Sequence, residues 1–159
     1  MVLHFVCTGN SYRSRLAQAY LNSKQIKGLE VISSGIAAFK NTNGPICWYS
    51  QRIIENNKLV PFESFHWQQT TKELLDKSDL IIFMKYLHFE YCEKELGYKG
   101  KNHKVFDIDD LAYARSKFFI KPKKNSWLDN ILCIGATEKT FSAIKKKIDD
   151  LIPQLSAGA

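Results

Sequence analysis

The 159-residue sequence has few of the features that mark secreted, membrane-spanning or disulfide-stabilised proteins. It contains only four cysteines, and their spacing is not that of a disulfide framework or a zinc site. The first apolar run is short and has no basic leader, and no apolar run approaches the length needed to cross a bilayer. We therefore expect a cytoplasmic protein with no membrane partner, no metal site and no cofactor.

Glycine, proline and acidic side chains are also scarce. There are 8 glycines and 4 prolines, and 16 acidic residues stand against 23 Lys and Arg, which gives a net charge of +7. The remaining composition, 45% apolar and 25% charged, is typical of a globular protein. The length fits one domain with a single substantial core, here residues 1–159. The excess of positive charge favours an anionic partner.

Apolar runs alternate with helical patterns along the chain. Strands are predicted at 2–6, 29–33, 79–84 and 103–108, and helices at 14–24, 45–57, 70–77, 86–96 and 138–155. Apolar strand segments separated by helical stretches indicate a parallel sheet that is covered on both faces. The predicted fold is therefore α/β, an open, mostly parallel four-stranded sheet with helices on both faces. In such a sheet ligands bind at the carboxyl ends of the strands.

The most informative segment joins the first strand to the first helix and reads Cys7-Thr8-Gly9-Asn10-Ser11-Tyr12-Arg13-Ser14. It ends at a helix N-terminus, where unpaired N–H groups and the positive end of the dipole favour an anion. These surroundings stabilise the thiolate of Cys7, which is the nucleophilic form. Arg13 offers a planar fork that can hold two oxygens of a tetrahedral oxyanion. The segment thus predicts a phosphate-binding loop with a cysteine nucleophile, directly after strand 1.

Three residues of this loop have expected structural roles. Gly9 permits a turn with φ above zero, and Asn10 tolerates a left-handed conformation and can hold the neighbouring backbone. The Ser14 hydroxyl is placed either to cap the helix or to donate to the thiolate.

The four histidines follow no order that suggests a catalytic triad, and we expect each to be structural or exposed: His4, His66, His88 and His103.

The loop resembles that of the low-molecular-weight protein tyrosine phosphatases, which reads Val-Cys-x-Gly-Asn-x-Cys-Arg-Ser-Pro. The residues that match one by one are Cys7, Gly9, Asn10, Arg13 and Ser14. Residues 33–39 resemble the family segment Ser-Ala-Gly-Thr-x-x-aromatic, with Phe39 at the position of the aromatic ring that flanks the substrate. The resemblance covers residues 1 to about 113 and resumes in the last helix, whereas residues 114–136 match poorly.

This resemblance implies a cysteine-dependent phosphatase that hydrolyses phosphotyrosine, or other aryl phosphomonoesters, through a phosphocysteine intermediate. The implied partners are phosphorylated proteins or small aryl phosphates, with inhibition by oxyanions such as phosphate and vanadate. The implied catalytic residues are Cys7, Arg13 and Asp110. The implied phosphate- and substrate-binding residues are Thr8, Gly9, Asn10, Ser11, Tyr12, Ser14 and Phe39.

Two positions depart from the family pattern. Tyr12 replaces the second loop cysteine, and Arg15 replaces the proline at the first helical turn. A cation at a helix N-terminus opposes the dipole. Arg15 is therefore interpreted either as an extra contact for an anionic substrate or as a solvated surface residue.

The general acid is harder to assign. A phosphatase of this kind needs a side chain that protonates the leaving oxygen. Residues 105–113 resemble the family's strand followed by Asp-Pro-Tyr-Tyr, and aligning the strand places Asp110 on the acid. Asp109 is a close rival, and Asp129 is a third candidate because it precedes the last helix by about the family's spacing.

Residues 115–124, which lie in a basic insert at about 114–136, carry five positive charges beside two phenylalanines. We favour a lid or a substrate-docking segment over nucleic-acid binding, since no recognised nucleic-acid motif is present.

Two alternative functions remain open. An arsenate reductase-like thiol enzyme would need two further thiols in the region after the third strand, and only Cys92 lies near that strand. A non-catalytic module that binds oxyanions or phosphoproteins would keep the loop and lose the acid.

Overall fold

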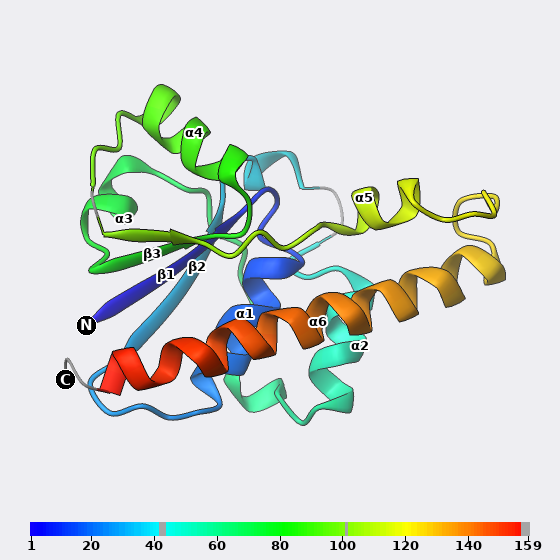
Figure 1. The fold of residues 1–159 in the computed structure, drawn as a ribbon, viewed down its shortest axis with the longest axis horizontal. Coiled ribbons are helices and arrows are strands. Elements are labelled where there is room, and N and C mark those ends of the chain that lie inside the picture. Colours follow the sequence, from blue (N-terminus) through cyan, green and yellow to red (C-terminus); the bar gives the residue numbers. More distant parts are fainter. Residues whose placement is uncertain (42–43, 101, 157–159) are drawn as a thin grey trace.

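The computed structural model describes residues 1–41, 44–100 and 102–156. Its centre is a four-stranded sheet, shown in Figure 1, in the order β2-β1-β3-β4, with every neighbouring pair parallel. The strands are β1 (Val2–Cys7), β2 (Glu30–Gly35), β3 (Leu80–Phe83) and β4 (His103–Val105). The predicted parallel α/β sheet is confirmed.

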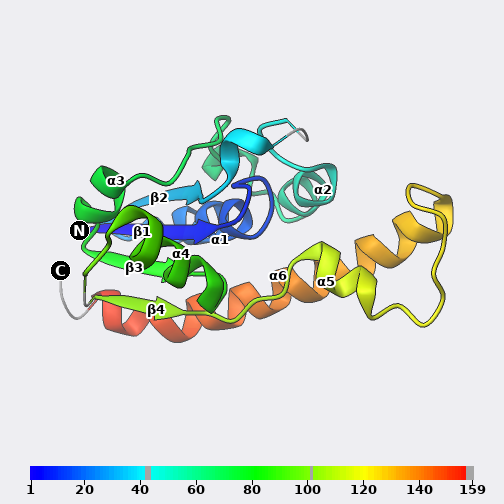
Figure 2. The same cartoon turned by 90° about the horizontal axis from the view of Figure 1, so that it is seen from above.

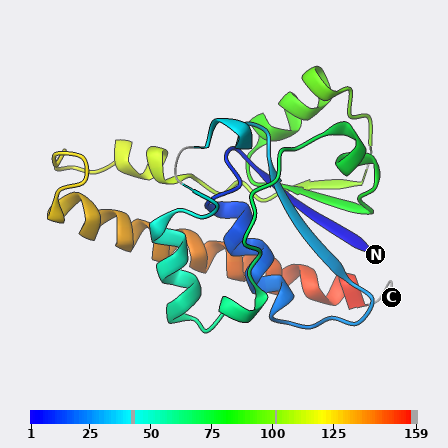
Figure 3. The ribbon, with the colours of Figure 1, turned by 180° about the vertical axis from the view of Figure 1, so that it is seen from behind.

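Helices cover both faces of the sheet. One face carries α1 (Arg13–Asn22), α2 (Trp48–Asn56) and α6 (Trp127–Ser156), which pack on one another and are seen together in Figure 3. The other face carries α3 (Lys72–Asp76) and α4 (Tyr86–Leu96) (Figure 1). Two short 3-10 helices are η1 (Ala38–Lys40) and η2 (Val60–Phe62).

The central strands β1 and β3 are buried almost throughout, which explains their apolar sequences. The edge strands β2 and β4 include exposed charged residues, Glu30 and Lys104. Leu3 and Phe5 of β1 belong to the core that includes α1 and α6, whereas Val6 packs with Ile81 and Phe83 of β3 in a second core on the α3/α4 side. All five side chains are essentially inaccessible to water. Burying a side chain of this size contributes about 1.5–3 kcal/mol, so the central strands provide a rigid base for the loops at their ends.

An arm extends beyond the sheet, as Figure 2 shows. It consists of α5 (Leu111–Ser116), the loop 117–126 and the first turns of α6. The sequence did not predict α5, whose N-cap is the Asp110 side chain, and it predicted the start of α6 at 138 rather than 127. In the N-terminal turns of α6 the buried positions are Asp129, Cys133 and Thr137, whereas in the C-terminal half they are large apolar residues such as Ile144 and Ile148, so the apolar pattern marks only that half.

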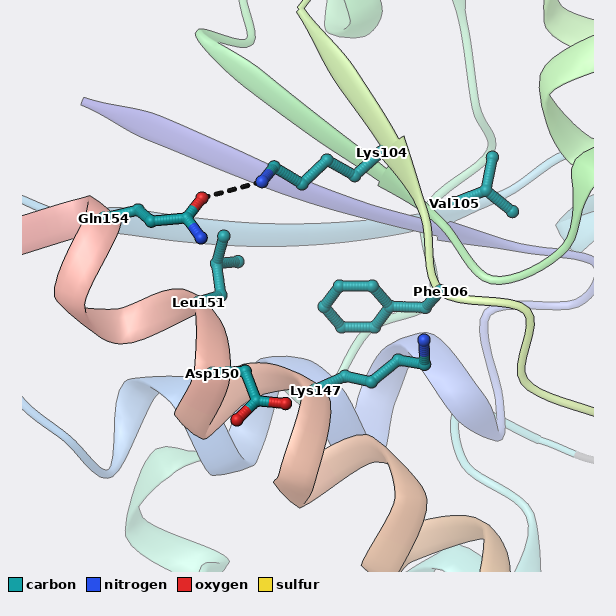
Figure 4. A pocket seen from close by; sticks show the side chains of 7 residues that line it. All are labelled: Lys104, Val105, Phe106, Lys147, Asp150, Leu151 and Gln154. Atoms are coloured by element: carbon teal, nitrogen blue, oxygen red, sulfur yellow. Dashed lines mark hydrogen bonds between the residues drawn. The ribbon is translucent and has the colours of Figure 1, made fainter.

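Strand β4 is shorter than the predicted 103–108. Asp107 has a φ of 54°, which a continuing strand cannot accommodate, although Ile108 N–H still donates to Met84 O at 2.8 Å. The strand forms one edge of the sheet, and the C-terminal half of α6 lies along it. Figure 4 shows the contact: Lys104 Nζ donates to Gln154 Oε1 at 2.7 Å beside a shallow cavity of about 220 Å³.

No helix among residues 1–41, 44–100 and 102–156 is both long enough and apolar enough to cross a membrane.

Candidate active site

The loop after β1 lies where the strand order reverses. The chain passes from β1 to β2 on one side and later returns to β3 on the other, and ligand sites of open parallel sheets are found at such switch points. Gly35, at the end of β2, packs directly against the loop. A Cβ atom there would lie 2.6 Å from both Asn10 N and Thr8 O, so only glycine allows this approach. The sequence of β2 therefore helps to set the position of the loop.

A cavity of about 240 Å³ opens at the loop. The residues that line it come from three parts of the chain. Residues 7–9 and 11–13 belong to the loop and the start of α1, residues 110–112 and Arg115 lie at α5, and Cys47 precedes α2. Three segments that are far apart in sequence thus surround the Cys7 thiol. Phe39 does not line this cavity, and its ring is 61% exposed.

The Cys7 sulfur is surrounded by hydrogen-bond donors. Asn10 N–H donates to Sγ at 3.3 Å, and the Ser14 hydroxyl lies 3.0 Å from Sγ. Asn10 Nδ2 donates to Ser14 Oγ at 3.0 Å, which leaves the hydroxyl proton of Ser14 free to point at the sulfur. Ser14 therefore takes the second of its two expected roles. The backbone N–H of Asn10 and the hydroxyl of Ser14 are thus the two polar neighbours of the expected nucleophile.

Asn10 holds the loop in shape. It is the left-handed residue of the loop, with a φ of 50°, whereas Gly9 is not among the residues with positive φ, so that expectation for Gly9 was wrong. Besides Ser14, Asn10 Nδ2 donates to Ser33 Oγ at 2.8 Å, and Oδ1 accepts from Gln68 N–H at 2.7 Å. This fully buried amide ties the loop to β2 and to the segment before α3.

Arg13 is almost completely buried, with 3% of its surface exposed, and begins α1. Its Nη1 donates to Ile108 O at 2.9 Å and its Nη2 to Thr8 Oγ1 at 3.3 Å. The loop after β4 thus fixes the guanidinium at the cavity wall. A guanidinium held this way can bind a tetrahedral oxyanion with little further loss of side-chain freedom.

His88 is a residue that the sequence did not connect with the site. Its Nε2 lies 3.0 Å from Thr8 Oγ1, and its Nδ1 accepts from Lys85 N–H at 3.0 Å. Because Nδ1 is an acceptor, the ring proton sits on Nε2 and is donated to Thr8. Burial lowers the pKa of His88 to about 3, and the charges of Arg13 and Lys85 act in the same direction. The contact spans 80 residues of chain, so no local signal predicts it.

The structure separates the candidate acids. Asp110 lines the cavity, and Asp109 instead forms an ion pair with Lys85 at 2.6 Å. Asp129 is 3% exposed and binds Arg115 through Oδ2 at 2.8 Å and Asn125 N–H at 2.8 Å. The hydrogen bond from Asn125 N–H, helped by Arg115, lowers the pKa of Asp129, which therefore stays ionised. Of the three carboxylates, Asp110 is the one that lines the cavity around Cys7.

The two positions that depart from the family pattern are both buried. Tyr12 donates its hydroxyl proton to Thr137 Oγ1 at 3.2 Å and so links the loop to α6. Arg15 donates to the carbonyl oxygens of Ser64 and His66 and is 3% exposed. Both interpretations of Arg15 were wrong, because its guanidinium fixes the segment before α3 and reaches neither bulk water nor the cavity.

Comparison with known proteins gives a match over nearly the whole chain. The sequence model described as "Low molecular weight phosphotyrosine protein phosphatase" matches residues 2–158. A protein-arginine-phosphatase of Geobacillus stearothermophilus is 24% identical over 155 residues, which are 96% of this chain and 91% of that protein. Among solved structures, a low molecular weight protein tyrosine phosphatase from Streptococcus pyogenes superposes with a TM-score of 0.71 at 16% identity, covering 97% of this chain and 92% of that one.

One further similarity covers only part of a longer protein. An oxygen-dependent coproporphyrinogen-III oxidase of Francisella tularensis is 28% identical over 116 residues, which are 69% of this chain and 37% of the oxidase. The chain thus spans little more than a third of that relative. Most of the oxidase lies outside the aligned segment.

Proposed function

Because the chain belongs to the low molecular weight phosphotyrosine protein phosphatase family, we propose that it hydrolyses phosphorylated protein side chains through a phosphocysteine intermediate on Cys7. The observation that carries this proposal is the set of donors around the sulfur. Asn10 N–H and the Ser14 hydroxyl stabilise the thiolate, and Arg13 lies on the same cavity wall. A cytoplasmic location fits this proposal, since a reducing compartment keeps the thiol free.

In the first step the Cys7 thiolate attacks the phosphorus. The S–P bond forms while the bond from phosphorus to the leaving oxygen breaks, and Asp110 donates a proton to that oxygen. Arg13 and the loop N–H groups hold the other oxygens, whose charge is stabilised most in the transition state. In the second step Asp110, now a carboxylate, takes a proton from water, and the hydroxide attacks phosphorus and releases the thiolate and phosphate.

Phosphotyrosine is the substrate that the sequence predicts. The apolar surfaces of Tyr12, Leu111 and Ala112, which line the cavity, can pack against a phenyl ring. Phe39, the aromatic residue expected to flank that ring, would have to turn towards the cavity when substrate binds.

Phosphoarginine is a second candidate. A relative named protein-arginine-phosphatase aligns over 96% of this chain, and the cavity wall includes the Ser11 hydroxyl and the Asp110 carboxylate. Both groups can accept hydrogen bonds from the N–H groups of a guanidine leaving group. For this substrate Asp110 would protonate nitrogen as the P–N bond breaks.

One experiment tests the activity and separates the substrates. The purified protein is assayed for phosphate release from p-nitrophenyl phosphate and from two peptides of the same sequence that carry phosphotyrosine or phosphoarginine. Trapping with acid and mass spectrometry then locates the phosphate on the enzyme. We expect a phosphorylated Cys7 with the preferred peptide. Turnover with no modification of Cys7, or turnover by Cys7→Ser, contradicts the proposed mechanism.

A further inference from the structure

A second cavity adjoins the candidate active site at the base of the arm. Its volume is about 490 Å³, and it shares Ala112 and Arg115 with the cavity around Cys7. Its other walls come from the end of α5 and from the loop 117–126, including Lys121 and Lys124. The two cavities are therefore neighbours at α5, and residues close to a phosphate at Cys7 lie near the second cavity.

The walls of the second cavity are positively charged. Of the five Arg and Lys residues between Asp110 and Asp129, three line this cavity, Arg115, Lys121 and Lys124, and the same stretch contains no acidic residue. Asp129 also lies on the wall, but Arg115 and Asn125 N–H already occupy its carboxylate. Lys121 Nζ donates a hydrogen bond to the carbonyl oxygen of Ser116, and Lys124 is exposed. The charge of the two lysines is thus left for an external anion.

Arg115 stands between the two cavities in a fixed orientation. Its Nε lies 3.2 Å from Asp129 Oδ1 and 3.0 Å from Cys133 Sγ, and its Nη2 donates to Asp129 Oδ2 at 2.8 Å. Its Nη1 makes no hydrogen bond within the part of the chain that the structure describes. A guanidinium held on two sides keeps its remaining N–H groups available to a ligand.

We propose that this second cavity binds an acidic side chain of the substrate, an Asp or Glu close to the phosphorylated residue. The proposal rests on the proposed function and narrows its substrate class to phosphoproteins with acidic segments around the phosphorylated site. Lysines at the cavity mouth, which are exposed, contribute selectivity and faster association rather than tight binding. An exposed ion pair changes affinity by about fivefold at most, so two lysines together give roughly a tenfold preference.

The test compares two phosphopeptides that differ only in their flanking residues, Asp and Glu in one and Asn and Gln in the other. For the wild type we expect kcat/KM about tenfold higher for the acidic peptide, mainly through KM, and a smaller ratio at high salt. In Lys121→Gln/Lys124→Gln the ratio should fall towards one. A matched control, Lys27→Gln/Lys146→Gln, removes the same charge from exposed positions outside the arm and should keep the ratio.

A binding measurement separates this proposal from the proposed function. Cys7→Ser cannot turn the peptides over, and fluorescence anisotropy gives its affinity for both of them. We expect the acidic peptide to bind about tenfold more tightly, and Lys121→Gln/Lys124→Gln introduced into this variant should remove the difference. Equal affinities for the two peptides overturn the second site even if the protein is a phosphatase. The proposal also fails if the control pair reduces the ratio as much as the arm pair, because net charge alone would then be responsible.

Discussion

The carboxylate of Asp110 lies 3.6 Å from Nη2 of Arg13, so the candidate acid and the candidate oxyanion clamp form an ion pair. The same carboxylate accepts Tyr113 N–H at 2.7 Å and caps α5. A phosphate that binds Arg13 would compete with Asp110 for the guanidinium.

Asp110→Asn should reduce the rate most for substrates with poor leaving groups. An activated phenoxide departs without a proton, whereas tyrosine does not, so the variant should lose about two to four orders of magnitude in kcat on phosphotyrosine and less on activated aryl phosphates. A plot of log kcat against leaving-group pKa measures the effect. Asp129→Asn is the comparison, and it should lower stability without changing the slope because Asp129 is buried against Arg115. If only Asp129→Asn changes the slope, the assignment of the acid is wrong.

Cys7→Ser should abolish turnover while vanadate or phosphate still binds. A serine hydroxyl in this loop is neither ionised nor a good leaving group, but Arg13 and the loop N–H groups that hold the oxyanion are unchanged. Oxyanion binding can be followed by the shift of the melting temperature, and hydrolysis by phosphate release. Substantial hydrolysis by the serine variant would contradict covalent catalysis.

Arg13→Lys keeps the positive charge but loses the planar guanidinium group with its two Nη donors. Nη1 and Nη2 contact different partners, Ile108 O and Thr8 Oγ1, and one ammonium group cannot reproduce that geometry. We expect a loss of about 10²–10³ in kcat, the usual effect of removing one oxyanion donor. Steady-state kinetics on p-nitrophenyl phosphate provides the measurement, and a rate near that of the wild type would show that Arg13 has only a structural role.

Two buried histidines should make the fold sensitive to mild acid. Burial lowers the pKa of His4 to about 4 and that of His88 to about 3, below their usual 6.5. The unfolded chain therefore binds more protons below pH 6.5, and the stabilisation, complete above that pH, is lost as the pH falls towards 4. Each histidine changes the free energy of unfolding by about 1.4 kcal/mol per pH unit within this window.

Urea denaturation between pH 7 and pH 5 measures this dependence. The slope of the free energy of unfolding against pH should be smaller in His88→Asn than in the wild type, by the amount that corresponds to about one bound proton. Equal slopes for His88→Asn and the wild type would show that His88 is not neutral in the folded protein.

Oxidation of Cys7 should be difficult to reverse. Tyr12 occupies the position of the family's second loop cysteine and cannot form a disulfide. Cys47 lines the same cavity, but its Sγ lies 3.2 Å from Ser50 Oγ and burial raises the pKa of its thiol, so it attacks an oxidised Cys7 slowly. We predict over-oxidised Cys7 after peroxide treatment, poor recovery with a reducing agent, and better recovery in Tyr12→Cys.

Mass spectrometry of the peroxide-treated protein tests whether Cys7 is over-oxidised or forms a disulfide. Cys47→Ser should lose activity at the same rate as the wild type and recover equally poorly. A disulfide that links Cys7 to Cys47 in the wild type would refute the prediction.

The sequence alone was sufficient for the parallel α/β sheet and for the loop from Cys7 to Ser14. Both depend on short-range information. Buried strands need uniformly apolar segments, and an anion loop needs its thiol, its arginine and a helix N-terminus within a few residues of one another. The left-handed conformation of Asn10 follows from its residue type, and the same reasoning placed Gly9 wrongly because two adjacent residues could have supplied the turn.

Only the tertiary structure decided which distant side chains meet at the loop. His88 reaches Thr8 across 80 residues, Arg15 is buried by the segment at Ser64, and Asp129 is paired with Arg115 rather than directed at the cavity. The arm shows the same limit, since the buried positions at the start of α6 are Asp129, Cys133 and Thr137, which are not the large apolar residues by which a sequence marks a buried helix face. Local sequence determines how a segment folds, but the packing of the sheet determines which loop ends come within hydrogen-bonding distance of Cys7.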